Sequence, residues 1–168
     1  MQLRALEPSD LNLLFTLEND SDLWLSSSTR APYSRVALKE HIALATRHDI
    51  YALRQLRLVA EKMIGERREA VGLVDLIDFS PEHHRAEVGI VVLPQYRRKG
   101  YGREILGSLE HYCRTILSLH QLYAYVPATN TASLALFAQS GYTTTAQLED
   151  WLFYQGQYWT THLLCLKL

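Results

Sequence analysis

The chain has 168 residues, of which 48% are hydrophobic and 21% charged, and its formal net charge is −1. This length suits a single domain, so we expect residues 1–168 to form one. A nucleic-acid partner needs clustered Lys and Arg, which the charge balance does not indicate. No apolar run is long enough to span a bilayer and no secretory signal is visible, so we expect no membrane partner. Cys113 and Cys165 lie far apart in apolar segments, which indicates reduced thiols in a cytoplasmic protein.

The first third of the chain predicts a strand, two helices and a long connection. Residues 2–6 alternate as a short strand does. Ser9 is a suitable N-cap for a helix that runs to about Glu18, and Ser34 is one for a second helix. Residues 19–33 are rich in Asn, Asp and Ser and show no period. We expect an irregular loop there, and loops of this length are often functional.

Strand patterns dominate the next segments. Residues 56–60 and 71–78 predict the two strands of a hairpin, with its turn at residues 65–68. Residues 87–93 are nearly all apolar after Glu87, which is typical of a strand buried on both faces.

The second half of the chain predicts two helices and three strands. A helix with one apolar face runs to about Leu117, and residues 122–126 form a strand. Asn130 is an N-cap for a short helix that Gly141 ends, and the chain closes with a hairpin around residues 155–156. The order of elements predicts an α+β fold, a single twisted, mixed, mostly antiparallel sheet flanked by helices.

A basic segment with two glycines follows the apolar strand. Residues 97–102 read Arg-Arg-Lys-Gly-Tyr-Gly and precede the amphipathic helix. A helix start presents free N–H groups and a positive dipole end, and glycine lets the backbone approach an anion, so we expect a diphosphate site. A P-loop is excluded because Lys99 precedes Gly100 with no Ser or Thr after it, and Ile105 stands where the dinucleotide fingerprint needs a small residue. The alternative is a basic turn that only caps the helix.

Three further motifs accompany this segment in chain order. They are His-Arg-Ala-Glu followed by the apolar strand and Pro-x-Tyr at 84–96, Asn-x-x-Ser-x-x-x-Phe-x-x-x-Gly-Tyr at 130–142, and Tyr-x-Gly-x-Tyr at 154–158. Together with Arg-x-x-Gly-x-Gly at 97–102, they resemble the GCN5-related N-acetyltransferase (GNAT) superfamily over essentially the whole chain. The resemblance is strongest to the spermidine/diamine acetyltransferase branch and weaker to the ribosomal-protein N-terminal acetyltransferases. It implies the GNAT fold and acetyl transfer from acetyl-CoA to an amine.

The resemblance also implies which residues bind acetyl-CoA. Backbone groups of the apolar strand would pair with the pantetheine arm as another strand does, and one N–H would stabilise the oxyanion of the tetrahedral intermediate. Amides at the helix start would hold the pyrophosphate. The implied residues are Ile90, Val91, Val92, Arg97, Arg98, Lys99, Gly100, Tyr101, Gly102, Arg103, Asn130 and Ser133.

Glu87 is the candidate catalytic residue. An alkylammonium with a pKa near 10.4 is neutral in only about one molecule in 10³ at pH 7, so an amine acceptor needs a base. Glu87 opens the strand that lines the acyl site, where a carboxylate can take the proton directly or through water and attract a cation. The alternative is a surface salt bridge with Arg85 or Arg98.

The chain departs from the resembling family at two places. Phe137 stands where many relatives have a tyrosine that protonates the departing thiolate. The thiol resembles cysteine, with a pKa near 8.5, so its anion is tolerable; Tyr142, Tyr101 or water remain open as substitutes. Residues 25–33 lack the glutamates with which spermidine enzymes bind polyamine, and Arg30 is added. Six acidic residues are left as an acceptor mouth or as solvated surface: Glu18, Asp20, Asp22, Asp75, Asp78 and Glu82.

The leading hypothesis is acetyl transfer to a primary amine of a diamine or polyamine by direct attack, because neither cysteine lies near Glu87 in the pattern. Alternatives are a protein N-terminal acetyltransferase, a non-catalytic acyl-CoA-binding sensor, which Phe137 motivates, and a nucleotide-binding module. The seven histidines lack metal-ligand spacing, so we expect no metal. Edge strands make a homo-oligomer plausible. The terminal hairpin contains four aromatic residues, for which simple cross-strand pairs, an acceptor channel and a dimer contact remain open: Trp151, Tyr154, Tyr158 and Trp159.

Overall fold

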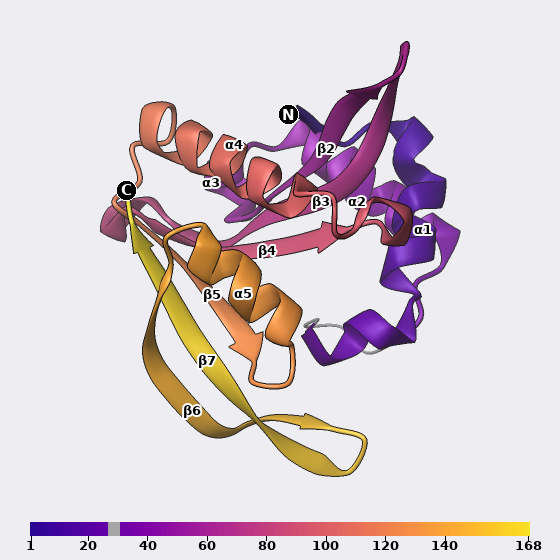
Figure 1. The fold of residues 1–168 in the computed structure, drawn as a ribbon. Helices are drawn as coiled ribbons and strands as arrows, with labels where there is room; N and C mark the ends of the chain where they lie inside the picture. Colours follow the sequence, from indigo (N-terminus) through magenta and orange to yellow (C-terminus); the bar gives the residue numbers. More distant parts are fainter. Residues whose placement is uncertain (27–30) are drawn as a thin grey trace.

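A seven-stranded sheet forms the centre of the protein (Figure 1). The computed structural model describes residues 1–26 and 31–168. The strand order is β1-β2-β3-β4-β5-β7-β6, and every neighbouring pair is antiparallel except β4 and β5, which run parallel. This arrangement confirms the predicted α+β fold. The strands are β1 (Gln2–Ala5), β2 (Leu56–Ile64), β3 (Arg67–Ser80), β4 (Arg85–Val92), β5 (Gln121–Pro127), β6 (Thr143–Tyr154) and β7 (Gln157–Lys167).

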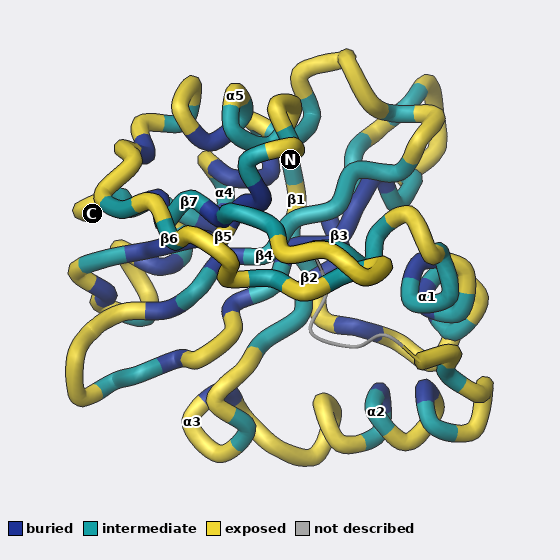
Figure 2. Tube along the Cα trace, turned by 90° about the horizontal axis from the view of Figure 1, so that it is seen from below, coloured by how far each residue is buried: buried dark blue, intermediate teal, exposed yellow. Residues whose placement is uncertain are grey.

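Helices cover both faces of this sheet (Figures 1 and 2). The larger core lies under α4 and α5, and a smaller one lies under α1 and α2. The α-helices are α1 (Leu11–Glu18), α2 (Arg35–Arg47), α3 (Ile50–Leu53), α4 (Tyr101–Thr115) and α5 (Thr131–Gln139). The 3-10 helices are η1 (Pro8–Asp10), η2 (Ser21–Ser26), η3 (Pro81–His83) and η4 (Pro94–Tyr96).

Two of the three predicted helix caps are confirmed. The hydroxyl of Ser34 accepts the N–H of Ala37 at 3.1 Å, and Asn130 Oδ1 accepts the N–H of Ser133 at 3.1 Å. The prediction for Ser9 is wrong: Ser9 lies inside η1, and α1 begins only at Leu11. The start of this segment is instead fixed by Asp10, whose carboxylate accepts the N–H of Glu7 at 2.8 Å and is paired with Arg4 of β1. That pairing is a tertiary contact, which a local capping pattern does not contain.

Several boundaries also differ from the prediction. The connection at residues 19–33 contains η2, and α3 was not predicted because four residues are too short to show a helical period. The hairpin turn is only Gly65–Glu66, since both strands extend further than expected. Residues 27–30, which include the added Arg30, lie outside the described part of the chain.

The strand β4 is not buried on both faces, as its apolar sequence had suggested. Ala86 and Val88 are buried, but Glu87 and all four residues from Gly89 to Val92 are only partly covered. The reason is the neighbouring strand: β4 pairs with β5 over three positions and then loses it. This parting of two central strands positions the candidate site.

Candidate active site

The strands β4 and β5 separate in the middle of the sheet, and we call the region between their diverging backbones the opening. Their parallel pairing covers three consecutive positions and ends at the pair Glu87–Tyr123. Beyond that pair the two strands diverge, with β5 turning away toward α5 (Figure 1). The edge of β4 from Val88 onward therefore has no strand partner on the β5 side within the described residues.

The alternation of backbone groups shows which residues face this opening. The N–H of Leu93 donates to the carbonyl of Val71 at 2.9 Å, so the main chain at position 93 points to β3. Because successive residues of a strand direct these groups to opposite sides, Ile90 and Val92 point theirs into the opening. Val91, which lies opposite Leu73 of β3, directs its main chain to that strand. Of the three residues predicted to contact acetyl-CoA through their main chain, Ile90 and Val92 thus lie with these groups at the free edge of β4, and Val91 does not.

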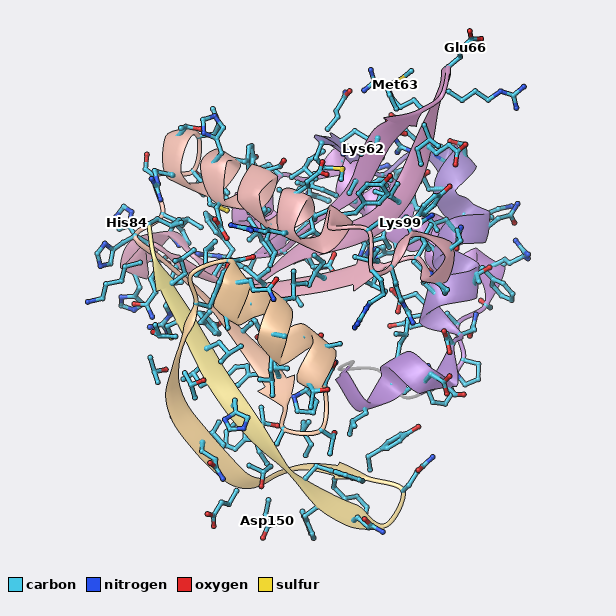
Figure 3. All side chains as sticks on the ribbon, in the orientation of Figure 1. Lys62, Met63, Glu66, His84, Lys99 and Asp150 are labelled. Atoms are coloured by element: carbon cyan, nitrogen blue, oxygen red, sulfur yellow. The ribbon has the colours of Figure 1, made fainter. Side chains whose placement is uncertain are left out.

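The start of α4 lies at the end of β4, beside the opening (Figure 3, near Lys99). Gly100 is the N-cap residue and has φ +81°, a conformation that glycine adopts without strain. No side chain caps this helix end, so the N–H groups of its first turn remain for a ligand. A Cβ on Gly102 would lie 3.0 Å from Cδ2 of Leu136, so Gly102 allows close packing of α4 on α5. The sequence had suggested only an approach to an anion.

The basic side chains here are exposed and carry no carboxylate partner among the described ion pairs. Arg97 donates from Nε to the carbonyl of Val92 at 3.0 Å, which ties its guanidinium to the free edge of β4. Lys99 Nζ lies 5.6 Å from the centre of the Tyr96 ring. Free positive charge and a helix N-terminus together fit a diphosphate.

The start of α5 supplies the remaining predicted contacts. Asn130 uses its Oδ1 to cap the helix through the N–H of Ser133, which leaves its Nδ2 group able to donate to a ligand. Asn130 is the N-cap of α5 and Ser133 lies in its first turn, on the same face of the sheet as α4. The predicted acetyl-CoA residues thus gather around the free edge of β4, and their roles stay predictions.

Glu87 points to the opposite face, toward the α1 and α2 side, because its neighbours Ala86 and Val88 are buried under α4 and α5. It is half-buried, and burial raises the pKa of its carboxyl, with a further contribution from the negative charge of Asp78. The alternative of a salt bridge with Arg85 or Arg98 is not found among the ion pairs of residues 1–26 and 31–168. A desolvated carboxylate with a raised pKa is a stronger base than an exposed one.

Tyr123 is a neighbour of Glu87 that sequence reasoning missed. Its hydroxyl donates to Oδ2 of Asp78 at 2.5 Å, and burial followed by this hydrogen bond raises the pKa of the phenol. Asp78 has φ +47°, so the end of β3 turns its carboxylate toward Tyr123. The signal in the sequence was the alternation of Tyr123 and Tyr125 with smaller apolar residues in a predicted strand.

Three of the six acidic residues left open as an acceptor mouth or as surface are paired with arginine. Arg57 is held by Asp75 through Nε–Oδ1 at 2.7 Å and Nη2–Oδ2 at 2.9 Å, and it also binds Glu18. Glu82 pairs with Arg54 at 2.9 Å. These carboxylates have arginine partners, whereas Asp78 has none among the ion pairs of the described residues and accepts the hydroxyl of Tyr123.

Of the two tyrosines offered as substitute acids, Tyr142 is buried in the core, whereas Tyr101 opens α4 beside the opening. Tyr142 packs edge-on against Phe137, with centroids 4.9 Å apart, and its buried hydroxyl has no hydrogen-bond partner in the described structure. Burial raises the pKa of this phenol, and the charges that act on it belong to Glu110 and Cys113. With a rise of about 1.5 Å per residue, Glu110 lies roughly 14 Å along α4 from its start at Tyr101. Lys62 Nζ of β2 lies 4.9 Å from the centre of the Tyr101 ring. Tyr101 opens α4 beside the opening, so Tyr101 and water both remain candidates for the acid.

No group of three or more His, Cys, Asp or Glu that could hold a metal occurs in the described part of the chain. Nor does any helix there have the length and apolar character to cross a membrane.

Comparisons with known proteins identify relatives along the whole chain. The acetyltransferase (GNAT) domain family matches residues 1–143. The spermidine N(1)-acetyltransferase of Vibrio cholerae is 30% identical over 158 residues, 94% of this chain and 87% of the relative. A crystal structure of the Vibrio cholerae enzyme in complex with CoA and spermine has a TM-score of 0.85 at 29% identity, covering 99% of this chain and 94% of that one. A dodecameric structure of the same enzyme has a TM-score of 0.81 at 29% identity, covering 99% of this chain and 92% of that one.

Proposed function

This chain belongs to the GNAT acetyltransferase family and is an acetyl-CoA-dependent N-acetyltransferase, and from that premise we propose that its acceptor is a primary amine of a diamine or polyamine. The observation that carries the proposal is the half-buried carboxylate of Glu87 beside the carboxylate of Asp78, on the face opposite the acetyl-CoA residues. Two carboxylates attract a cationic amine, and the one with a raised pKa can take its proton. The spermidine enzymes among the relatives support the same acceptor class.

The reaction that we propose is a direct attack. Glu87 accepts a proton from the ammonium group, directly or through water, and the neutral nitrogen then attacks the acetyl carbonyl carbon. The new C–N bond replaces the C–S bond, and CoA leaves as a thiolate that takes its proton from Tyr101 or water, because Phe137 has no hydroxyl. Main-chain groups of Ile90 and Val92, the segment 97–103 and the start of α5 would hold the acetyl donor during this step.

The test is a steady-state assay that follows thiol release with 1,4-diaminobutane, spermidine and a peptide with a free N-terminus. We expect the two aliphatic amines to give the higher kcat/KM, because the carboxylates of Glu87 and Asp78 on the acceptor side attract an ammonium group. A clear preference for the peptide would overturn the proposal in favour of a protein N-terminal acetyltransferase. Micromolar binding of acetyl-CoA by calorimetry with no release from any amine would indicate the sensor.

Two further properties belong to the proposal. A homo-oligomer is supported by the dodecameric relative and by edge strands that end the sheet at β1 and β6. A cytoplasmic location stays a prediction from the two unpaired cysteines, Cys113 and Cys165.

A further inference from the structure

A row of aromatic side chains leads away from Glu87 along the acceptor face. Leu122, Ala124 and Val126 of β5 are buried under α4 and α5, so the alternate residues Tyr123 and Tyr125 lie on the face of Glu87. The two rings meet edge-on at 5.8 Å and 82°. Tyr123 lies beside Glu87 across the β4–β5 pairing, which makes this row continuous with the candidate base.

Trp151 extends the row from another part of the sheet. Its indole stacks on the ring of Tyr125 at 6.1 Å and 22°, although β7 lies between β5 and β6 in the sheet. The pairing of β6 with β7 is irregular between Leu148 and Leu152, and Asp150 within that stretch has φ +51°. Such bulges redirect side chains, and Figure 3 shows Asp150 in the part of this hairpin that projects from the domain. The irregularity thus brings Trp151 over β7 to Tyr125.

The stacked pair remains open to solvent. Tyr125 is 38% exposed and Trp151 is 56% exposed, so the contact between them does not account for most of the indole surface. An aromatic face attracts a cation, and does so more strongly where carboxylates nearby also favour positive charge. Asp78, which binds the Tyr123 hydroxyl, and Glu87 supply that charge at the inner end of the row.

We propose that Tyr125 and Trp151 bind the second, non-reacting ammonium group of the acceptor and the methylenes next to it, and so select diamines over monoamines. The inference rests on the proposed function only in placing the reacting amine at Glu87. Trp151, which lies in β6 of the terminal hairpin, is then a specificity-determining residue, whereas the proposed base Glu87 lies in β4.

The experiment compares Trp151→Leu and Trp151→Phe with the unmodified full-length protein, using 1,4-diaminobutane and the monoamine n-butylamine. A cation–π contact of about 1.4 kcal/mol corresponds to about a tenfold change in binding. We expect Trp151→Leu to raise KM for the diamine about tenfold with little change in kcat, and to leave n-butylamine unaffected. Trp151→Phe should restore most of the diamine affinity.

A binding measurement separates this inference from the proposed function. Calorimetric titration of 1,4-diaminobutane into the protein with CoA present reports the subsite even if no amine is acetylated, and Trp151→Leu should weaken that binding about tenfold. The matched control is Tyr158→Leu, which removes an aromatic side chain of the same hairpin that packs on Phe153 rather than Tyr125; diamine affinity should be unchanged. Equal diamine affinity in Trp151→Leu, no diamine binding in the unmodified protein, or an equal loss for both amines would overturn the inference.

Discussion

The two sides of β4 are built in different ways. The side that faces α4 and α5 consists mainly of main-chain features in one stretch of chain: a free strand edge at Ile90 and Val92, a helix start at Gly100 and the basic residues between them. The opposite side consists of side chains from separate strands, Glu87 from β4, Asp78 from β3 and Tyr123 from β5. Main-chain groups can bind the same acetyl donor whatever side chains the strand carries. On the acceptor side, by contrast, a single substitution can alter which amine is bound.

The largest effect that would test this division is the loss of the proposed base, Glu87. Glu87→Gln removes the carboxylate but keeps the shape of the side chain, so we expect kcat/KM for a diamine to fall by roughly 10²–10⁴-fold. Affinity for acetyl-CoA, measured by calorimetry, should stay the same because Glu87 lies on the other face. Glu66→Gln, at the tip of the β2–β3 hairpin (Figure 3), is the matched control with no expected change.

The pH profile sharpens the same prediction. Because burial and Asp78 raise the pKa of Glu87, its basic form is lost on acidification at a higher pH than an exposed glutamate would lose it. The unmodified protein should therefore lose kcat on acidification through that raised pKa, and Glu87→Gln should lack this limb. A variant that retains both the rate and the limb would show that another group is the base.

The division also explains what the sequence could predict. The segment 97–102 and the Asn130 cap are local patterns, and the structure places both beside the opening. Glu87 was found because it opens an apolar strand. Tyr123 and the pairing of Arg57 with Asp75 were missed, since they depend on the register of neighbouring strands, which one-dimensional periodicity does not contain. The start of the first helical segment was assigned to Ser9 instead of Asp10 for the same reason, since Asp10 is held by a contact with Arg4 of β1.

The second largest effect concerns the ion pairs of Arg57, which stabilise the acceptor side of the sheet. Arg57 joins Glu18 at the end of α1 to Asp75 on β3, and all three side chains are largely covered. Arg57→Met would leave two carboxylates without their cation, so we expect the free energy of unfolding to fall by about 3 kcal/mol, measured by urea denaturation. Adding Asp75→Asn to this variant should recover part of the loss. Full stability in the single variant would show that the network does not hold α1 on the sheet.

A smaller effect is expected on the donor side. Arg97→Leu removes one cation beside the helix start and its hydrogen bond to the Val92 carbonyl. The dissociation constant of acetyl-CoA should rise about tenfold, as expected for the loss of one charge-assisted contact of about 1.5 kcal/mol. Calorimetry with 1,4-diaminobutane should show no change, and Arg67→Leu at the distant hairpin is the control. A loss of diamine affinity instead would mean that the two sides of β4 are not separate.

The smallest effect belongs to a residue on neither side. The Tyr142 hydroxyl is buried without a hydrogen-bond partner in the described structure and faces the distant part of α4. Because burying an unpaired hydroxyl is unfavourable, Tyr142→Phe should leave stability unchanged or raise it by up to about 1 kcal/mol. It should also leave kcat unchanged, since the hydroxyl cannot reach a thiolate at the opening. A fall in kcat with stability intact would instead identify Tyr142 as the acid that takes the place of the hydroxyl missing from Phe137. The buried Tyr142 side chain would then have a catalytic role in addition to its packing in the core.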